Sequence, residues 1–220
     1  MMFPIFLLAH EHETFGQAHE FQLFLMRKIL GARQARHPLH ETRLVESDMR
    51  EDDVCIWRGV QCTKGIVTGI VWKQGIRSIS LQTVLYEWFP PSIETIDFER
   101  LCTRDYVETR CLPGKLRHFR VVACRLRGPF DMQTLPVLLE MLDIRKNDFS
   151  GVVHLDLLPQ TIQIINLSGN RFTKALVCNH RLPVALQRAY LTQSDEVMFR
   201  CICTDEKTLD ARLEVGNRSQ

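Results

Sequence analysis

The amino-acid sequence predicts an α/β-type solenoid: a right-handed coil with a short parallel β-sheet on its concave face and an N-terminal helical cap. Two observations lead to this fold. An apolar residue followed by proline recurs at steps of 23, 23, 23 and 24 residues, and aliphatic residues recur at fixed places after each proline. Such a period is typical of stacked coils, because a single coil cannot bury its own apolar side. The dipeptides are Phe89-Pro90, Leu112-Pro113, Leu135-Pro136, Leu158-Pro159 and Leu182-Pro183.

Three rows of apolar residues follow these dipeptides with the spacing of a short strand. In the pattern Leu-x-x-Leu-x-Leu, alternate side chains point to the same side of the strand. Stacking the coils joins these side chains into a continuous core and sets the strands side by side in a parallel sheet. The rows are Ile93, Leu116, Leu139, Ile162 and Leu186; Ile96, Phe119, Leu142, Ile165 and Ala189; and Phe98, Val121, Ile144, Leu167 and Leu191. Alternating strands and full helices are disfavoured, because the prolines and short return segments leave little room.

An asparagine or cysteine is expected after each strand, where its side chain bonds backbone groups left unpaired in the turn. Asn147 and Asn170 hold this place in two repeats, and Cys124 holds it in a third. Leu101 and Ser194 occupy it in the first and last repeats, so this ladder is incomplete at both ends. The period and this pattern together are the signature of a leucine-rich-repeat solenoid.

The residues before the repeats resemble a specific cap. Residues 55–62 read Cys-x-Trp-x-Gly-Val-x-Cys, and an apolar run over 66–72 follows. Upstream, a capping-box pattern at 14–17 precedes Phe21, Phe24, Leu25 and Ile29 at helical spacing, and Gly31 can end the helix. The motif resembles the N-terminal cap of plant-receptor-type leucine-rich-repeat proteins, and the whole is similar to the leucine-rich-repeat proteins abundant in kinetoplastid protists. The resemblance implies a disulfide between Cys55 and Cys62.

The chain is therefore predicted to contain four segments. Residues 1–13 form an apolar N-terminal segment, residues 14–65 the helical and cysteine cap, residues 66–205 the repeats, and residues 206–220 a polar C-terminal tail. Residues 73–88 do not keep the register of the repeats, so an irregular first coil is expected.

Charge and hydropathy exclude some classes of partner. The chain has 28 Lys and Arg against 26 Asp and Glu, a net charge of +2, which predicts no nucleic-acid partner. The basic stretch from Arg117 to Arg127 is interpreted as a local solvated or ligand-facing patch. No stretch reaches the ~20 apolar residues of a membrane span, so no stable membrane insertion is expected.

Two localisations remain open. Residues 1–9 are apolar and uncharged, but they lack the positive start of a secretory leader. The paired cysteines of the cap are usual in an oxidising compartment. Secretion or display at the cell surface is preferred, with the cytoplasm as the alternative.

Near the end of the solenoid there are two pairs of residues of the types that bind metals or form disulfides. The two members of each pair are one repeat apart. Cys178 and Cys201 are separated by 23 residues, as are His180 and Cys203. Stacked coils would bring each pair to about 5 Å, within the range of a disulfide. The preferred interpretation is unpaired side chains, with a disulfide or a zinc site as the alternatives.

No catalytic motif is present. The histidines and glutamates at residues 10–20 do not form His-Glu-x-x-His, and no nucleophile elbow, phosphate-binding loop or dinucleotide fingerprint occurs. We therefore expect no enzymatic activity, no cofactor and no metal.

The solvent-facing residues of the predicted sheet indicate a protein-protein interaction module without catalysis. Because Arg and Tyr are enriched at binding hot spots, they are the leading contacts, together with two acidic neighbours. The predicted partner-binding residues are Asp97, Arg120, Asp143, Arg145, Arg188 and Tyr190. The expected partner is another protein or peptide. The alternative is a regulatory or inhibitory domain that blocks an enzyme or receptor through the same face.

Overall fold

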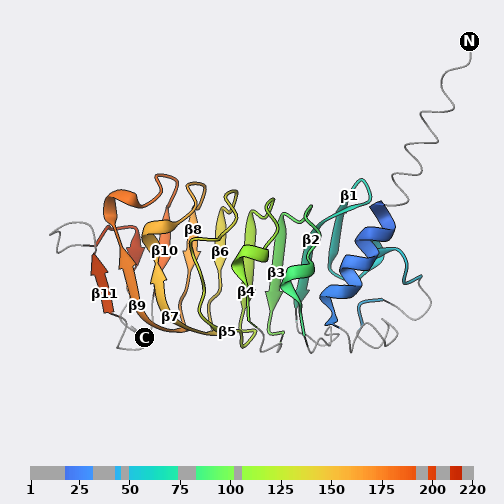
Figure 1. The fold of residues 1–220 in the computed structure, drawn as a ribbon, viewed down its shortest axis with the longest axis horizontal. Coiled ribbons are helices and arrows are strands. Elements are labelled where there is room, and N and C mark those ends of the chain that lie inside the picture. The colour runs from blue at the N-terminus through green and yellow to red at the C-terminus, as the bar shows by residue number, and fades with distance from the viewer. Residues whose placement is uncertain are drawn as a thin grey trace, which may run out of the picture.

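The chain folds as a β-solenoid whose coils stack along one axis, with the N-terminal helix at one end (Figure 1). This computed structural model describes residues 18–31, 43–45, 50–73, 83–101, 106–191, 198–201 and 209–214. One contiguous apolar core runs through the described residues, from Met26 in the helix to Leu213 near the C-terminus.

One long side of the solenoid is an eight-stranded sheet among the described residues. Each strand from β2 onward pairs in parallel with the next, and β1 pairs antiparallel with β2. The predicted parallel sheet is confirmed, and its register advances by one repeat per strand. The strands are β1 (Val60–Thr63), β2 (Ile66–Lys73), β3 (Thr95–Glu99), β4 (His118–Val122), β6 (Met141–Asp143), β8 (Ile164–Asn166), β10 (Arg188–Tyr190) and β12 (Leu213–Glu214).

The return side of the coils carries a second sheet that the sequence analysis did not predict. It runs in the order β11 (Met198–Cys201), β9 (Arg171–Val177), β7 (Asp148–His154) and β5 (Arg127–Gly128), with parallel pairing. The alternation of inward and outward side chains in β7 is hard to recognise in the sequence, because its pairing register shifts between Gly151 and Val152. Short 3-10 turns then lead into the proline dipeptides: η3 (Tyr86–Trp88), η4 (Thr109–Cys111), η5 (Leu155–Leu157) and η6 (Asn179–Arg181).

The three predicted apolar rows form the core. Every one of their fifteen residues is buried. Aromatic rings extend this packing along the solenoid axis, with centroid separations of 5.1 to 6.5 Å. Stacked and edge-to-face ring pairs of this kind add to the free energy of apolar burial. The continuous run is Trp72, Phe98, Tyr86, Phe119, Phe130, Phe149 and Phe172.

The asparagine ladder is confirmed. The Oδ1 of Asn147 accepts hydrogen bonds from the backbone N–H of Cys124 at 2.9 Å and of Leu126 at 3.2 Å. Its Nδ2 donates to the carbonyl of Val121 at 2.7 Å, in the preceding coil. Asn170 repeats the arrangement one coil later, accepting from Phe149 N–H at 3.2 Å. Each asparagine therefore ties its own turn to the coil before it.

The residue before each ladder position adopts a left-handed backbone in four consecutive coils. Arg100, Ala123, Lys146 and Gly169 have φ of 58°, 54°, 57° and 67°. This geometry turns their N–H groups toward the next coil: Arg100 donates to Val122 O at 2.9 Å and Lys146 donates to Ser168 O at 2.8 Å. The repeated turn therefore links successive coils through the backbone.

The cap motif has a local physical basis. Cys55 and Cys62 form a disulfide with a Cα separation of 5.8 Å. Trp57 is buried, and its indole N–H donates to Glu51 O at 3.3 Å. Gly59 has φ of +77°, and a Cβ there would collide with the backbone oxygen of Val71. The glycine is needed because β2 approaches it closely, with Val71 N–H donating to Gly59 O at 2.6 Å.

Residues 18–29 are helical, but the buried face differs from the predicted one. Leu25 and Ile29 are buried as expected, whereas Phe21 and Phe24 are exposed. Phe24 instead packs edge-on against Trp88 at 6.0 Å. The inward face includes Gln22, whose Oε1 accepts from Val67 N–H at 2.7 Å, so a polar residue fastens the helix to β2. The capping-box residues 14–17 lie outside the described residues.

The C-terminal end differs from the sequence-based view in two ways. Part of the expected polar tail contributes β12, where Leu213 is buried, and the Arg212 guanidinium donates to Asp210 and to the Pro183 carbonyl. Cys178 is buried and disulfide-bonded, so the preference for unpaired side chains was wrong for this residue. A sulfur held in a disulfide cannot act as a thiolate ligand for zinc. The side chains of Cys201 and Cys203 lie outside the described residues.

Candidate interface on the eight-stranded sheet

The solvent-facing side of the eight-stranded sheet, called here the sheet face, presents side chains in fixed rows. In the central row, Asp97 lies opposite Arg120, and Arg120 lies opposite Asp143. The row continues through Asn166 to Tyr190 on β10. A second row, nearer the starts of the strands, contains Thr95, His118, Met141, Ile164 and Arg188. The parallel register thus places residues that are 23 or 24 positions apart side by side.

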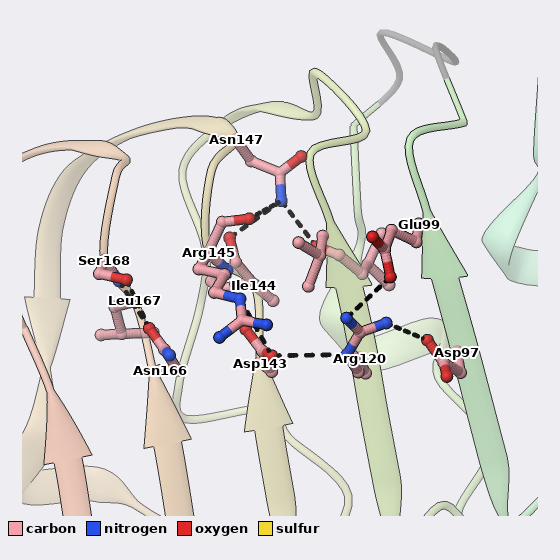
Figure 2. A network of polar contacts seen from close by, with 12 residues as sticks. Asp97, Glu99, Arg120, Asp143, Ile144, Arg145, Asn147, Asn166, Leu167 and Ser168 are labelled. Atoms are coloured by element: carbon pink, nitrogen blue, oxygen red, sulfur yellow. Dashed lines mark hydrogen bonds and ion pairs between the residues drawn. The ribbon is translucent and has the colours of Figure 1, made fainter. Parts of the chain in front are cut away.

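Four of the six predicted contact residues form one ion-pair network (Figure 2). Arg120 is at its centre, because its guanidinium binds Asp97 at 2.5 Å and Glu99 at 3.0 Å and lies 3.6 Å from Asp143. Asp143 is also 3.6 Å from Arg145, and Lys73 lies 3.0 Å from Asp97. The network balances three carboxylates against three cations.

Burial and hydrogen bonding shift the pKa values of Glu99, Asp143 and Arg120 in opposite directions. The hydrogen bond from Arg120 lowers the pKa of Glu99. Burial raises the pKa of Asp143 against the opposing backbone hydrogen bond and charge of Arg145. Burial also disfavours the charged form of Arg120, but its bonds to Asp97 and Glu99 outweigh this and raise its pKa. Arg120 therefore stays charged, as a cross-link between three strands.

Asp143 and Asn166 play the same local role in adjacent strands. The Oδ1 of Asp143 accepts from Arg145 N–H at 3.3 Å, and the Oδ1 of Asn166 accepts from Ser168 N–H at 3.1 Å. Ser168 also donates its hydroxyl to Asn166 at 2.7 Å. Figure 2 shows the change of character, from ion pairs around Arg120 to neutral hydrogen bonds at Asn166.

The other two predicted contacts lie two coils away from the network. Arg188 donates to the hydroxyl of Tyr190 at 3.3 Å and lies 3.7 Å from Glu214 on β12. The hydrogen bond to Tyr190 raises the pKa of Arg188. Arg188 is well exposed, with 63% of its side chain accessible, compared with 21% for Arg120. Arg188 is thus far more available to a partner than Arg120.

Asp97, Arg120 and Asp143 were predicted as separate partner contacts, but in the structure they neutralise one another. A signal for it exists, since residues 23 apart with alternating charge come into direct register once the repeat is aligned. Met141 and Ile164 were not among the predicted contacts, although they lie opposite each other and half-buried at the centre of the face. Flexible methionine side chains are common at binding surfaces, so this apolar pair at mid-face could pack against a partner.

Across the described residues, no three or more His, Cys, Asp or Glu side chains gather where a metal ion could bind. No described helix has the length and apolarity needed to cross a bilayer.

No protein-family model matches the chain, and no curated protein matches it. Among solved structures, the crystal structure of a pollen receptor kinase 3 resembles the fold, with a TM-score of 0.48 and 17% sequence identity. The likeness covers 74% of this chain and 84% of that chain. The solenoid architecture rests on the register of the chain's own strands.

Proposed function

We propose that the protein is a leucine-rich-repeat interaction module with a plant-receptor-type cap, and that it binds another protein or peptide through the sheet face. The family assignment is supported by the cap motif, by the 23-residue period and by the buried asparagines after β6 and β8. The resemblance to kinetoplastid leucine-rich-repeat proteins belongs to the same proposal. Modules of this architecture act by presenting an extended surface rather than by catalysis.

One observation supports the binding role. The strands of the sheet face are held in place by pairing and ion pairs, yet the side chains of this face lie outside the apolar core. The strands are held by backbone pairing on both sides, and the Arg120 network cross-links β3, β4 and β6. Preorganised surfaces bind better, because fewer side chains lose conformational freedom on association. Arg188 and Tyr190 then provide the cationic and aromatic groups that are enriched at binding hot spots. Met141 and Ile164 add apolar surface beside them.

The six predicted contacts therefore fall into two roles within this proposal. Asp97, Arg120 and Asp143 hold the face in shape, while Arg145, Arg188 and Tyr190 are more accessible and contact the partner. The disulfide of the cap and that of Cys178 favour a protein exported to an oxidising compartment.

Site-specific photo-crosslinking tests this function. A photoreactive residue replaces Ile164 on the sheet face or, as the control, the exposed Thr173 of β9 on the opposite sheet. In native extract, Ile164 should yield a discrete protein adduct that excess unlabelled protein competes away, and the Tyr190→Ala protein should compete poorly. Adducts that form equally at Thr173, or that the Tyr190→Ala protein suppresses as well as wild type does, would contradict the proposal.

A further inference from the structure

We propose that Asn166 on the sheet face is an N-glycosylation site, and that its glycan covers the part of this face that binds the partner. Residues 166–168 read Asn-Leu-Ser, the acceptor sequence Asn-x-Ser/Thr without proline in the middle. The second half of the proposal rests on the function proposed above, because the glycan regulates that same surface. Since so short a motif also arises by chance, the geometry of its residues decides.

The two polar residues of the motif form one compact turn. The Oδ1 of Asn166 accepts hydrogen bonds from the backbone N–H of Ser168 at 3.1 Å and from its hydroxyl at 2.7 Å. This is an Asx turn, in which an asparagine side chain bonds the residue two positions later. Figure 2 shows both groups, with the amide nitrogen of Asn166 on the side away from Ser168. The atom that receives the sugar therefore points out of the turn.

The Nδ2 of Asn166 has no structural role among the described residues. It donates no hydrogen bond to them, and the side chain is partly exposed. By contrast, the Nδ2 of Asn147 donates to the Val121 carbonyl at 2.7 Å, and that of Asn170 donates to the Leu167 carbonyl at 2.8 Å. Both of these asparagines are buried, and neither begins an acceptor sequence. A sugar would break the ladder at either one, whereas Asn166 can carry it outward.

Glycan transfer has to precede folding at this site. In the folded chain the Asn166 carbonyl accepts from Ile144 N–H at 3.0 Å, and Leu167 N–H donates to the Tyr190 carbonyl at 2.9 Å. These bonds hold the acceptor sequence inside the sheet, where a transferase has no access to its backbone. After transfer, only Leu167 of the three motif residues enters the core, so the modified chain can fold in the same way.

The transfer step uses a donor that the secretory route supplies, an oligosaccharide carried on a lipid pyrophosphate. The Nδ2 of Asn166 attacks the anomeric carbon of the first sugar. A carbon–nitrogen bond forms, the bond from that carbon to the pyrophosphate oxygen breaks, and the lipid pyrophosphate leaves with its electron pair. The amide nitrogen gives up one proton. The disulfides at Cys55–Cys62 and at Cys178 agree with passage through this oxidising compartment.

A glycan on Asn166 lies over the proposed contacts. Asn166 is directly opposite Asp143 on β6 and Tyr190 on β10, and neighbouring strands are about 4.8 Å apart. Ile164 is two residues earlier on the same strand, so its side chain lies on the same side of the sheet. Because an N-linked glycan is bulky and well solvated, it shields both Ile164 and Tyr190. The fraction of chains that carry it then sets the fraction that can bind.

Expression of the full chain behind an added secretory leader in a eukaryotic host tests the site. Protein recovered from the medium has passed the transferase. Enzymatic release of N-glycans in heavy-oxygen water leaves a heavy-oxygen aspartate at each occupied asparagine, which peptide mass spectrometry locates. The label is expected at Asn166 in wild type and in Ser168→Thr, and it should be lost in Ser168→Ala. An unlabelled Asn166 in the wild-type protein, or a label that persists in Ser168→Ala, would overturn the proposal.

Hydroxyl-radical labelling of tyrosines tests the covering role without a partner. Wild-type glycoprotein is compared with Asn166→Gln from the same host. Tyr190 should lose most of its labelling in the glycoprotein relative to the variant. Tyr106 is the matched control, since it is 61% exposed and packs over Gly128 of the second sheet; its labelling should be the same in both proteins. Equal labelling of Tyr190 in the two proteins would overturn the covering role.

Crosslinking at Ile164 in the Asn166→Gln background separates this proposal from the proposed function. An occupied Asn166 and a shielded Tyr190, together with failed crosslinking, would leave the glycan site standing without the partner surface. An unlabelled Asn166 with successful crosslinking would do the reverse.

Discussion

Lys146 and Gly169 occupy the same place in consecutive coils, and the backbone of both is left-handed. The two residues also lie close together: a Cβ added to Gly169 would be 3.3 Å from the Lys146 nitrogen and 3.4 Å from its Cα. Gly169 thus allows one coil to approach the next. At the equivalent position, Lys146 adopts a positive φ that is unfavourable for a residue with a side chain.

Gly169→Ala should destabilise the protein by about 1 kcal/mol or more, because alanine pays for the positive φ and crowds Lys146. Lys146→Gly should have the opposite sign. Its gain should be smaller, since glycine also loses more backbone entropy on folding. Urea unfolding of both variants measures the difference. Two substitutions that destabilise equally would show that the lysine is not strained.

Asn147→Ala should destabilise by about 3 kcal/mol, because it leaves the buried N–H groups of Cys124 and Leu126 without an acceptor, at ~1–3 kcal/mol each. Asn166→Ala is the matched control, since Asn166 is half-exposed and water can replace its bonds. Its cost should stay below about 1 kcal/mol. Similar losses in the two variants, measured by chemical denaturation, would contradict the ladder's role.

Glu99→Gln should be less stable than wild type at pH 7 by about 0.5–1 kcal/mol, the scale of a well-placed ion pair. The pKa of Glu99 is lowered in the folded state by the hydrogen bond from Arg120, so its contribution is present above the ordinary value of 4.5. That contribution disappears as the pH falls through the folded pKa. Urea midpoints of the two proteins should therefore converge as the pH falls below 4.5 and through the lowered pKa of Glu99, and a constant gap would refute the assignment.

Asp143→Asn should behave in the opposite way. Burial raises the pKa of Asp143 above the ordinary value of 3.8, so the folded state favours the protonated form and loses stability as the pH rises through the raised pKa. Asparagine keeps the turn bond, as Asn166 shows in the next strand. Relative to wild type, the variant should thus gain stability between pH 3 and pH 6. A relative loss over that range would mean that the ion pairs outweigh burial.

Replacing Cys55 and Cys62 by serine should cost about 2–3 kcal/mol, the loop-closure entropy expected for a seven-residue separation. Because the cap covers one end of the apolar core, the loss should appear as a lower unfolding midpoint of the whole solenoid. Circular dichroism during thermal unfolding checks this. A midpoint within one degree of wild type would show that Trp57, Gly59 and the Gln22 bond suffice to hold the cap.

Most of the solenoid was predictable because its core repeats along the chain. Ile96, Phe119 and Leu142 recur with the period, and the asparagine at 147 follows from the backbone groups that a tight turn leaves unpaired. The second sheet was not predictable in the same way, because β7 carries a bulge at Gly151 and β5 has only two residues. The helix face was misjudged because Gln22 points inward to bond the β2 backbone, while Phe21 and Phe24 remain outside.

The candidate interface was predictable in position but not in character. Strand alternation alone places Asp97, Arg120 and Tyr190 on the solvent side. Whether Arg120 is available to a partner depends on its three carboxylate neighbours, which come together only when coils from different parts of the chain stack. The left-handed turns at Arg100 and Lys146 leave no mark in a hydrophobic pattern, since their role is set by backbone geometry.

The central claim is that the sheet face binds a partner. The most direct test is the dissociation constant of the complex with a partner that crosslinking has identified. Calorimetric titration would compare wild type with Ile164→Ala, Tyr190→Ala and, as the control on the opposite sheet, Thr173→Ala. We predict that each face variant weakens binding at least tenfold, while Thr173→Ala matches wild type. Unchanged affinity in both face variants, or a loss confined to Thr173→Ala, would contradict it.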